Sequence, residues 1–145
     1  MNSGPQPIRV AVLGAGTVGA EVAHQLLTRA AELEARVGAP LVLAGVAVRD
    51  LTAVRHPALP KELLTTDAES LVLGAHIVVE LIGGVDRARE LVLLALESGA
   101  DVITGNKALL ATHGPELFAA AERVGAQLNY EAAVGGAIPI IRPLR

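Results

Sequence analysis

The sequence predicts an α/β protein built on a doubly wound, parallel β-sheet. Three observations support this fold class. Short runs of β-branched and aliphatic residues alternate along the chain with longer segments whose apolar residues recur at helical spacing. Glycine, proline or a helix-capping residue separates most neighbouring segments. The length of 145 residues favours one domain, and an aromatic content of 1 % means that its core must be aliphatic.

Five apolar runs have the composition of strands buried on both faces of a parallel sheet. In chain order, the predicted strands are Ile8–Leu13, Leu41–Val48, Ile77–Ile82, Asp101–Thr104 and Gln127–Tyr130. Residues 49–60 carry two prolines and mixed charges, so we expect a loop there.

Four segments are predicted to be helices, and a glycine that can end a helix follows each of them. The predicted helices run from Thr17 to about Val37, from the caps Thr66 and Asp67 to Leu73, from Asp86 to about Ser98, and from Pro115 to Val124. Residues 1–7 are expected to be a disordered lead-in to a domain that spans residues 8–131.

Composition narrows the range of functions. The net charge of −3 and the lack of a basic stripe argue against nucleic acid as a partner. The absence of cysteine excludes disulfides and cysteine nucleophiles and fits a reducing compartment. The four histidines show no metal-ligand spacing, and no apolar run reaches the ~18 residues that span a bilayer. We therefore expect a cytoplasmic protein without membrane contact.

The most informative motif is Gly14-x-Gly16-x-x-Gly19, directly after the first strand and opening the first helix. Gly14 permits a tight turn, Gly16 lets the backbone approach a pyrophosphate, and Gly19 lets the helix pack closely on the strand. The helix N-terminus offers free N–H groups and a positive dipole end to the anion. This context predicts a dinucleotide-binding Rossmann domain, and the alternative is an ordinary glycine-rich turn.

The end of the second strand leaves the choice between NAD and NADP open. A carboxylate here, such as Asp50, would bind the ribose hydroxyls of NAD and repel a 2′-phosphate. Arg49, beside it, could instead pair with that phosphate through its planar guanidinium. A solvated surface arginine is the alternative interpretation of Arg49.

Two further motifs fall beyond strand ends, where ligands lie in open α/β sheets. Gly83-Gly84 would let a nicotinamide ring pass close to the backbone, although a turn with positive φ explains the pair equally well. Lys107 follows the fourth predicted strand, and its ammonium can bind a carboxylate or phosphate or polarise a carbonyl. An ordinary surface lysine is the alternative.

Glu131 precedes a glycine-rich segment. A carboxylate followed by such a turn can gather several oxygen ligands for a hard cation. The alternative is an interdomain linker in which Glu131 has an N-capping role.

In this order, the segments GAGTVG, VAVRD, ELIGG, GNKALLA and YEAAVGGAIPII resemble the homoserine dehydrogenase family from Ile8 to the last residue. The resemblance implies an NAD(P)-dependent oxidoreductase that reduces L-aspartate 4-semialdehyde to L-homoserine, on the route to threonine and methionine. Gly105 stands where the family often has alanine. The family continues into a substrate and dimerisation domain. The resemblance therefore implies that residues 132–145 begin the connection to that domain, that this part alone is inactive, and that the full-length protein is a homodimer.

The resemblance also implies site residues. Those implied for cofactor binding are Gly14, Gly16, Thr17, Val18, Gly19, Arg49, Gly83 and Lys107. Arg49 would meet the 2′-phosphate, Gly83 would lie near the nicotinamide, and Lys107 would be catalytic at the junction of cofactor and substrate. Those implied for a sodium site are Glu131 and the backbone carbonyls of Val134, Gly136 and Ile138.

Two other functions are weighed against this one. A Rossmann domain of this length could be a nucleotide-sensing regulatory module, but a sensor needs neither a lysine at the hydride site nor a cation-binding turn. Aspartate-semialdehyde dehydrogenase would need a catalytic cysteine, and this stretch contains none.

Overall fold

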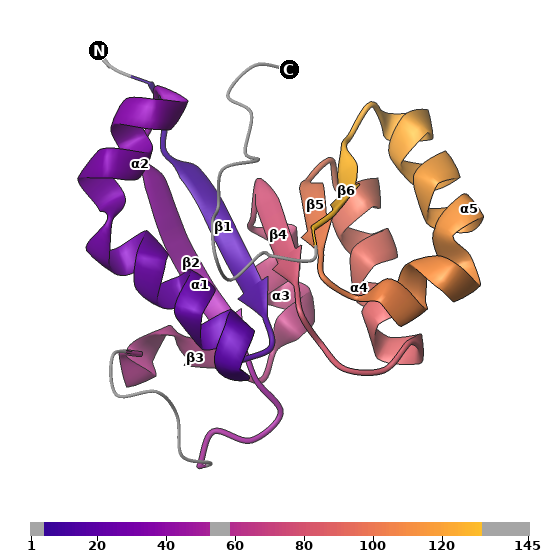
Figure 1. Ribbon diagram of the computed structural model, residues 1–145, viewed down its shortest axis with the longest axis horizontal. Coiled ribbons are helices and arrows are strands. Elements are labelled where there is room, and N and C mark those ends of the chain that lie inside the picture. The colour runs from indigo at the N-terminus through magenta and orange to yellow at the C-terminus, as the bar shows by residue number, and fades with distance from the viewer. Residues whose placement is uncertain (1–4, 53–58, 132–145) are drawn as a thin grey trace.

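The computed structural model describes residues 5–52 and 59–131 and confirms the predicted fold class (Figure 1). Six strands form one sheet in the order β3-β2-β1-β4-β5-β6, and every neighbouring pair is parallel. This is the strand order of a Rossmann domain. The strands are β1 Ile8–Leu13, β2 Leu41–Ala47, β3 Leu64–Thr65, β4 Ile77–Glu80, β5 Asp101–Thr104 and β6 Leu128–Tyr130.

The helices cover both faces of the sheet, α1 and α2 on one face and α3, α4 and α5 on the other (Figure 1). A 3₁₀ turn, η1 (Lys61–Leu63), leads into β3. The helices are α1 Thr17–Thr28, α2 Ala30–Val37, α3 Ala68–Leu73, α4 Asp86–Glu97 and α5 Lys107–Val124.

Side chains along β1 alternate between two aliphatic cores. Val10 and Val12 pack with α1 and α2, whereas Ala11 and Leu13 pack with α3, α4 and α5. All four are fully buried, as expected for a central parallel strand. The sheet is therefore the middle of three layers, and the second half of β1 is covered on both faces.

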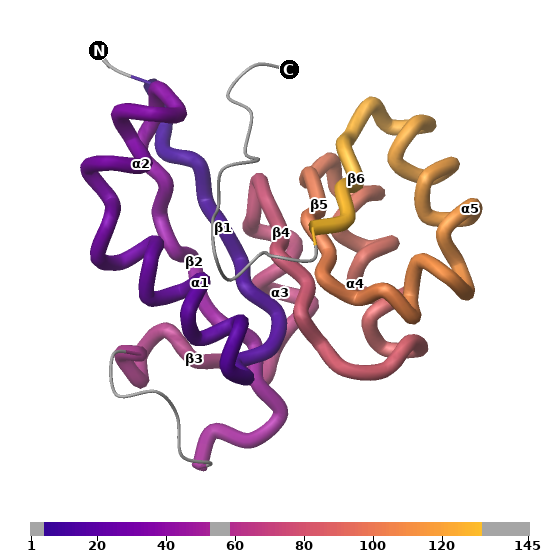
Figure 2. Tube along the Cα trace, in the orientation of Figure 1, coloured from indigo at the N-terminus to yellow at the C-terminus, as the bar shows by residue number. Residues whose placement is uncertain are grey.

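The chain changes direction across the sheet between β1 and β4, because β2 and β3 lie on one side of β1 and β4 to β6 on the other. Figure 2 shows that the turn after β1 and the loop after β4 leave the sheet at the same edge. Such a switch point opens a crevice beyond the carboxyl ends of the strands, where ligands bind in open α/β sheets. The glycine motif lies at this edge.

The predicted helix from Thr17 to Val37 is in fact two helices that meet at Arg29, so the single-helix prediction is wrong. Arg29 has φ −114° and ψ 29°, outside helical geometry. Thr28 Oγ1 donates to the carbonyl of His24 (2.8 Å), a back-bond that bends helices. Apolar spacing continues through the bend, because Leu26 and Leu33 pack into the same core.

Helix α5 begins eight residues before the predicted start at Pro115, because the side chain of Asn106 caps it by accepting from Leu109 N–H (3.0 Å). Pro115 therefore lies inside the helix. Gly114 makes this possible, since it lacks the Cβ that would crowd the proline ring in helical conformation. The prediction treated Pro115 as a first helical residue.

Smaller differences concern strand and helix ends. β3 was not predicted, because its two residues are too short to show a pattern. Asp86 was expected to cap α4 but is its first residue, and Val85 is the cap. The prediction for α3 is confirmed: Asp67 caps it, accepting from Ser70 N–H, and the helix ends before Gly74.

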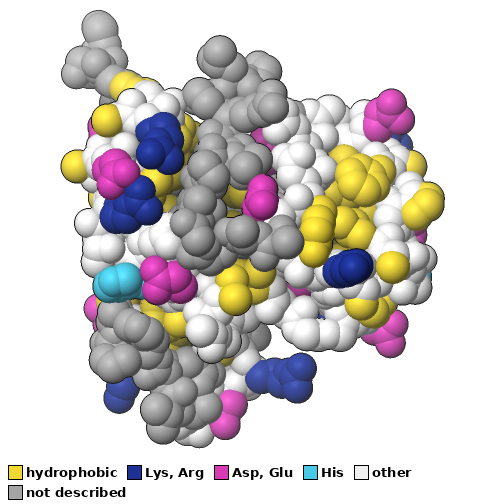
Figure 3. All heavy atoms as spheres, in the orientation of Figure 1, with side chains coloured by type: hydrophobic (Ala, Val, Ile, Leu, Met, Phe, Trp, Pro, Cys, Tyr) yellow, Lys and Arg dark blue, Asp and Glu magenta, His cyan; other side chains and the backbone are white. Residues whose placement is uncertain are grey.

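The outer face of α2 carries acidic and basic side chains side by side (Figure 3). Glu32 pairs with Arg29 (2.5 Å) and Arg36 (3.7 Å). These pairs are exposed, so they contribute little to stability and mark a solvent-facing helix. No helix within residues 5–52 and 59–131 has the length and apolar character needed to cross a membrane.

We predict that Gly19→Ala destabilises the chain, because an ideal Cβ at residue 19 would lie 2.0 Å from the carbonyl oxygen of Gly14. Moving α1 to relieve this overlap should cost about 1–3 kcal/mol, the usual range for overpacking. Urea unfolding measures the change. Gly74→Ala is the control, since its nearest neighbour would lie at 3.7 Å, an ordinary contact. Equal stability of the two variants would contradict this reading of the turn.

Candidate functional site

The turn between β1 and α1 requires glycine at two positions. Gly14 has φ +101°, and a Cβ there would lie 2.8 Å from the carbonyl oxygen of Leu81. A Cβ at Gly19 would strike the carbonyl oxygen of Gly14, while Val12 Cγ1 lies farther away at 3.7 Å. The first turn of α1 therefore packs against the backbone of Gly14, the residue that follows β1. As expected, Gly14 permits the tight turn and Gly19 permits close packing of the helix.

Gly16 has a different surrounding. It is the N-cap of α1, and nothing lies within 4 Å of a Cβ built on it. Within the described part of the chain, no side chain caps this helix. Its first-turn N–H groups are therefore available to an anion that approaches over Gly16, with Thr17 and Val18 exposed beside it.

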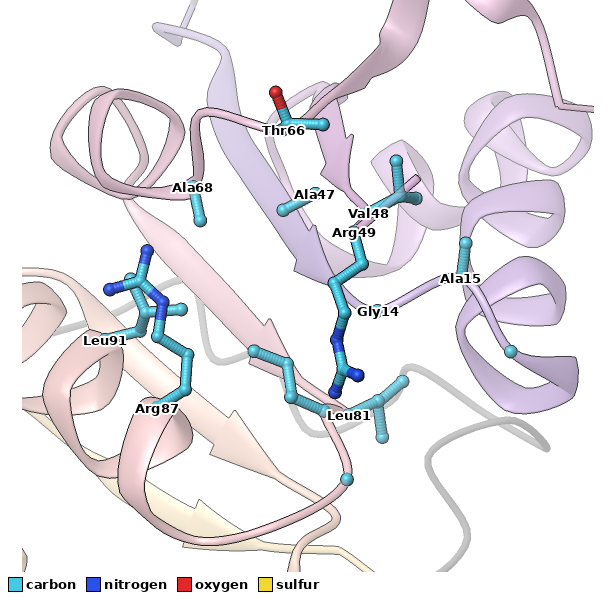
Figure 4. A pocket seen from close by; sticks show the side chains of 13 residues that line it. Gly14, Ala15, Ala47, Val48, Arg49, Thr66, Ala68, Leu81, Arg87 and Leu91 are labelled. Carbon is cyan, nitrogen blue, oxygen red and sulfur yellow. The ribbon is translucent and has the colours of Figure 1, made fainter. Parts of the chain in front are cut away.

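A cavity of about 700 Å³ opens beside this turn (Figure 4). Its walls come from the turn after β1, the end of β2, the start of α3, the segment after β4 and the first turns of α4. Figure 4 shows the side chains of Arg49 and Arg87 on different walls, Arg49 extending toward the segment that carries Leu81. The cavity thus combines aliphatic walls with two guanidinium groups.

The two arginines differ in their partners. Arg87 pairs with Glu69 of α3 (3.0 Å) and with Glu90 (3.3 Å). Arg49 has no ion pair within residues 5–52 and 59–131. The carboxylate of Asp50 accepts from the backbone N–H and the hydroxyl of Thr52 (2.8 and 2.6 Å), which holds it in a local turn. The group that faces the cavity at the end of β2 is therefore the arginine.

A smaller hollow of about 320 Å³ adjoins the cavity and shares the segment Leu81–Gly83 with it. Its other lining residues are Val18 and the stretch Gly105–Lys107. The structure therefore brings Val18, Gly83 and Lys107 together. Lys107 lies beyond the carboxyl end of β5, as expected, and is the exposed first residue of α5. Gly84, with φ +91°, supports the turn interpretation for the second glycine of its pair.

Glu80, the last residue of β4, is a fully buried carboxylate to which the sequence analysis, although it included the segment ELIGG, gave no role. Its Oε1 accepts from Thr104 Oγ1 (2.5 Å), and its Oε2 accepts from Ile82 N–H (2.9 Å). The amide of Asn106 lies 3.4 Å from Oε2. Burial raises the pKa of Glu80 above its ordinary value, and these hydrogen bonds partly offset that rise. The available signal was an acidic residue inside the otherwise apolar run Ile77–Ile82.

The expected cation ligands are only partly described. Glu131 follows β6, and its backbone N–H donates to the carbonyl of Thr104 (3.0 Å). Val134, Gly136 and Ile138 lie outside the described residues. The placement of Glu131 is therefore known, and its role as a ligand stays a prediction.

Comparison with known proteins agrees with this geometry. Residues 14–131 match the sequence model of a family described as "Homoserine dehydrogenase, NAD binding domain". The chain is 53 % identical over 141 residues to homoserine dehydrogenase of Mycobacterium tuberculosis and 48 % identical over 140 residues to that of Corynebacterium glutamicum. These alignments cover 96 % and 95 % of this chain but only 32 % and 31 % of the relatives.

A solved structure shows the same likeness. The crystal structure of a homoserine dehydrogenase from Thiobacillus denitrificans superposes with a TM-score of 0.80 at 43 % identity, covering 90 % of this chain and 30 % of that one. The chain thus spans about a third of the length of the proteins it matches. The family model covers most of this chain, including the glycine turn and both hollows. The chain therefore belongs to the homoserine dehydrogenase family, of which it carries the NAD-binding domain.

Proposed function

We propose that this chain binds NAD(H) or NADP(H) across the switch point of its sheet, and that the protein containing it reduces L-aspartate 4-semialdehyde to L-homoserine. The observation that carries the proposal is the open approach over Gly16 to the uncapped start of α1, directly beside the larger cavity. An anionic pyrophosphate fits this place, because backbone N–H groups and the helix dipole favour negative charge there. Family membership supports the choice of reaction.

The lining of the two hollows supports one orientation of the cofactor. The larger one lies toward the end of β2 and contains Arg49, so it suits the adenosine half and a 2′-phosphate. The smaller one contains Gly83 and Lys107, so it suits the nicotinamide half. The pyrophosphate between them would rest on the turn from Gly14 to Gly19.

Lys107 is proposed as the catalytic residue of this chain. The bound nicotinamide would supply the hydride, and the aldehyde oxygen would gain negative charge as the carbonyl is reduced. An ammonium at the rim of the smaller hollow would stabilise that charge and hold the substrate against the cofactor. A cation at the first position of a helix opposes the helix dipole, so helix stability does not explain Lys107.

The lysine beside Gly83 also favours the oxidoreductase over the nucleotide-sensing module, because a sensor has no carbonyl to polarise. Further proposals follow from the family resemblance. The carboxylate of Glu131, directly after β6, would contribute to a sodium site. The complete protein would be a cytoplasmic homodimer acting on a small-molecule substrate.

Gly16→Val should weaken cofactor binding without unfolding the chain. The open space at residue 16 accommodates the side chain, which would then occupy the path of the pyrophosphate. We expect the affinity for NADPH, measured by calorimetry, to fall by about tenfold or more, which corresponds to ~1.4 kcal/mol. The melting temperature should change little. Unchanged affinity would show that the pyrophosphate binds elsewhere.

Arg49→Ala should weaken NADPH far more than NADH. A charge-assisted hydrogen bond contributes about 1.5–3 kcal/mol, or roughly 10- to 150-fold in affinity. Arg87→Ala is the matched control, because it removes the same charge from a different wall of the same cavity. That variant should affect both cofactors by similar factors. Equal losses of NADH and NADPH affinity in Arg49→Ala would refute its role at the 2′-phosphate.

In the complete protein, Lys107→Ala should lower kcat for aldehyde reduction by about 10²–10⁴, the usual contribution of a positioned acid–base group. Melting temperature should be nearly unchanged, since the side chain is exposed. Lys61→Ala is the control, because Lys61 is the other lysine of this chain and lies on η1. If Lys107→Ala kept the kcat and KM of the wild type, Lys107 would have no catalytic role and would be an ordinary surface lysine.

A further inference from the structure

We propose that Glu80 is a positioning residue that holds together the two walls of the smaller hollow and so shapes the place where the nicotinamide binds. This inference rests on the proposed function, because it takes the smaller hollow to be the nicotinamide end. One wall is the segment after β4, which contains Gly83. The other is the start of α5, which contains Lys107.

The carboxylate of Glu80 gathers donors from both walls. Ile82 N–H belongs to the segment after β4, and Thr104 Oγ1 belongs to the end of β5, just before α5. Both oxygens of Glu80 are therefore used, on a side chain that is 0 % exposed. The backbone also joins here, since Gly105 N–H donates to the carbonyl of Glu80 (3.0 Å). Glu80 thus lies at the point where the two walls diverge from the sheet.

Asn106 extends this arrangement to the rim of the hollow. Its amide nitrogen donates to the carbonyls of Ile82 (3.1 Å) and Gly84 (2.7 Å), while its side-chain oxygen caps α5 through Leu109 N–H. Its own backbone N–H donates to Thr104 Oγ1 (3.0 Å), the hydroxyl that donates to Glu80. One connected set of hydrogen bonds therefore runs from Glu80 to the backbone on either side of Gly83 and to the residue before Lys107.

Fold stability alone does not call for an acid at this position. Burying a carboxylate is costly, and an apolar side chain of similar shape often serves a core equally well. The preceding β4 residues Ile77–Val79 are all apolar and buried. The carboxylate instead fixes the path of the chain. It accepts a hydrogen bond from the N–H of Ile82, two residues further along, and so the segment after β4 turns out of the sheet. β4 accordingly ends at Glu80, two residues before the sequence predicted.

The test compares two probes that differ only in the nicotinamide end, NADPH and 2′-phospho-ADP-ribose, binding to the 145-residue chain. Wild-type chain should bind NADPH more tightly. Glu80→Gln turns one acceptor into a donor, so at least one of the gathered donors loses its partner. We expect it to lose about five- to tenfold in NADPH affinity, roughly 1–1.4 kcal/mol, and to keep its affinity for 2′-phospho-ADP-ribose. Asn106→Ser should do the same; serine still caps α5 but cannot clamp Ile82 and Gly84.

Asp101→Asn is the matched control. It makes the same acid-to-amide change at the start of β5, the opposite edge of the sheet, where Asp101 accepts from Gln127 N–H (2.8 Å). It should leave both affinities unchanged. The inference is overturned if both probes weaken in parallel in Glu80→Gln and Asn106→Ser, or if the variants keep the wild-type preference for NADPH, or if wild-type chain shows no such preference. Failure of wild-type chain to bind either probe would instead refute the proposed function.

Discussion

The structure depends most on how closely the turn after β1 passes the backbone that follows β4. Gly14 leaves no room for a side chain beside the carbonyl of Leu81, and Gly19 leaves none beside the carbonyl of Gly14. These two contacts hold α1 against the sheet, and α1 with α2 closes one of the two aliphatic cores. The same contacts bring the start of α1 to the edge of the larger cavity. Packing and the anion-binding geometry therefore have a common cause, and neither could change without the other.

The segment Leu81–Gly83 divides the site into two ends of different chemistry. Toward β2 the walls are aliphatic with two arginines, a surrounding that favours negative charge. Toward β5 the walls are held by hydrogen bonds that converge on a buried carboxylate. A ligand with a charged end and a planar, polar end matches this asymmetry. NADP(H) would match it, because its 2′-phosphate lies at one end of the molecule and its nicotinamide at the other.

Much of this could be predicted from the sequence. Buried parallel strands show as continuous aliphatic runs, and glycine positions identify the turn, so the fold class and the outline of the site were accessible. The bend at Arg29 was not, because apolar spacing continues through it. The start of α5 was misplaced because Asn106 looked like part of a binding motif, whereas it also caps the helix. The hydrogen bonds of Glu80 could not be predicted from the sequence, because its partners Thr104 and Asn106 lie more than twenty positions away in the chain.

The ion pair between Arg87 of α4 and Glu69 of α3 joins two helices whose first turns line the larger cavity. Both side chains are about half exposed, at 47 % and 52 % of their surface. Dissolved salt weakens such a contact, because mobile ions screen exposed charges over about 8–10 Å at physiological strength. One contact at the entrance to the larger cavity therefore weakens as the salt concentration rises, whereas the hydrogen bonds to the buried carboxylate of Glu80, at the other end of the site, are shielded from dissolved ions.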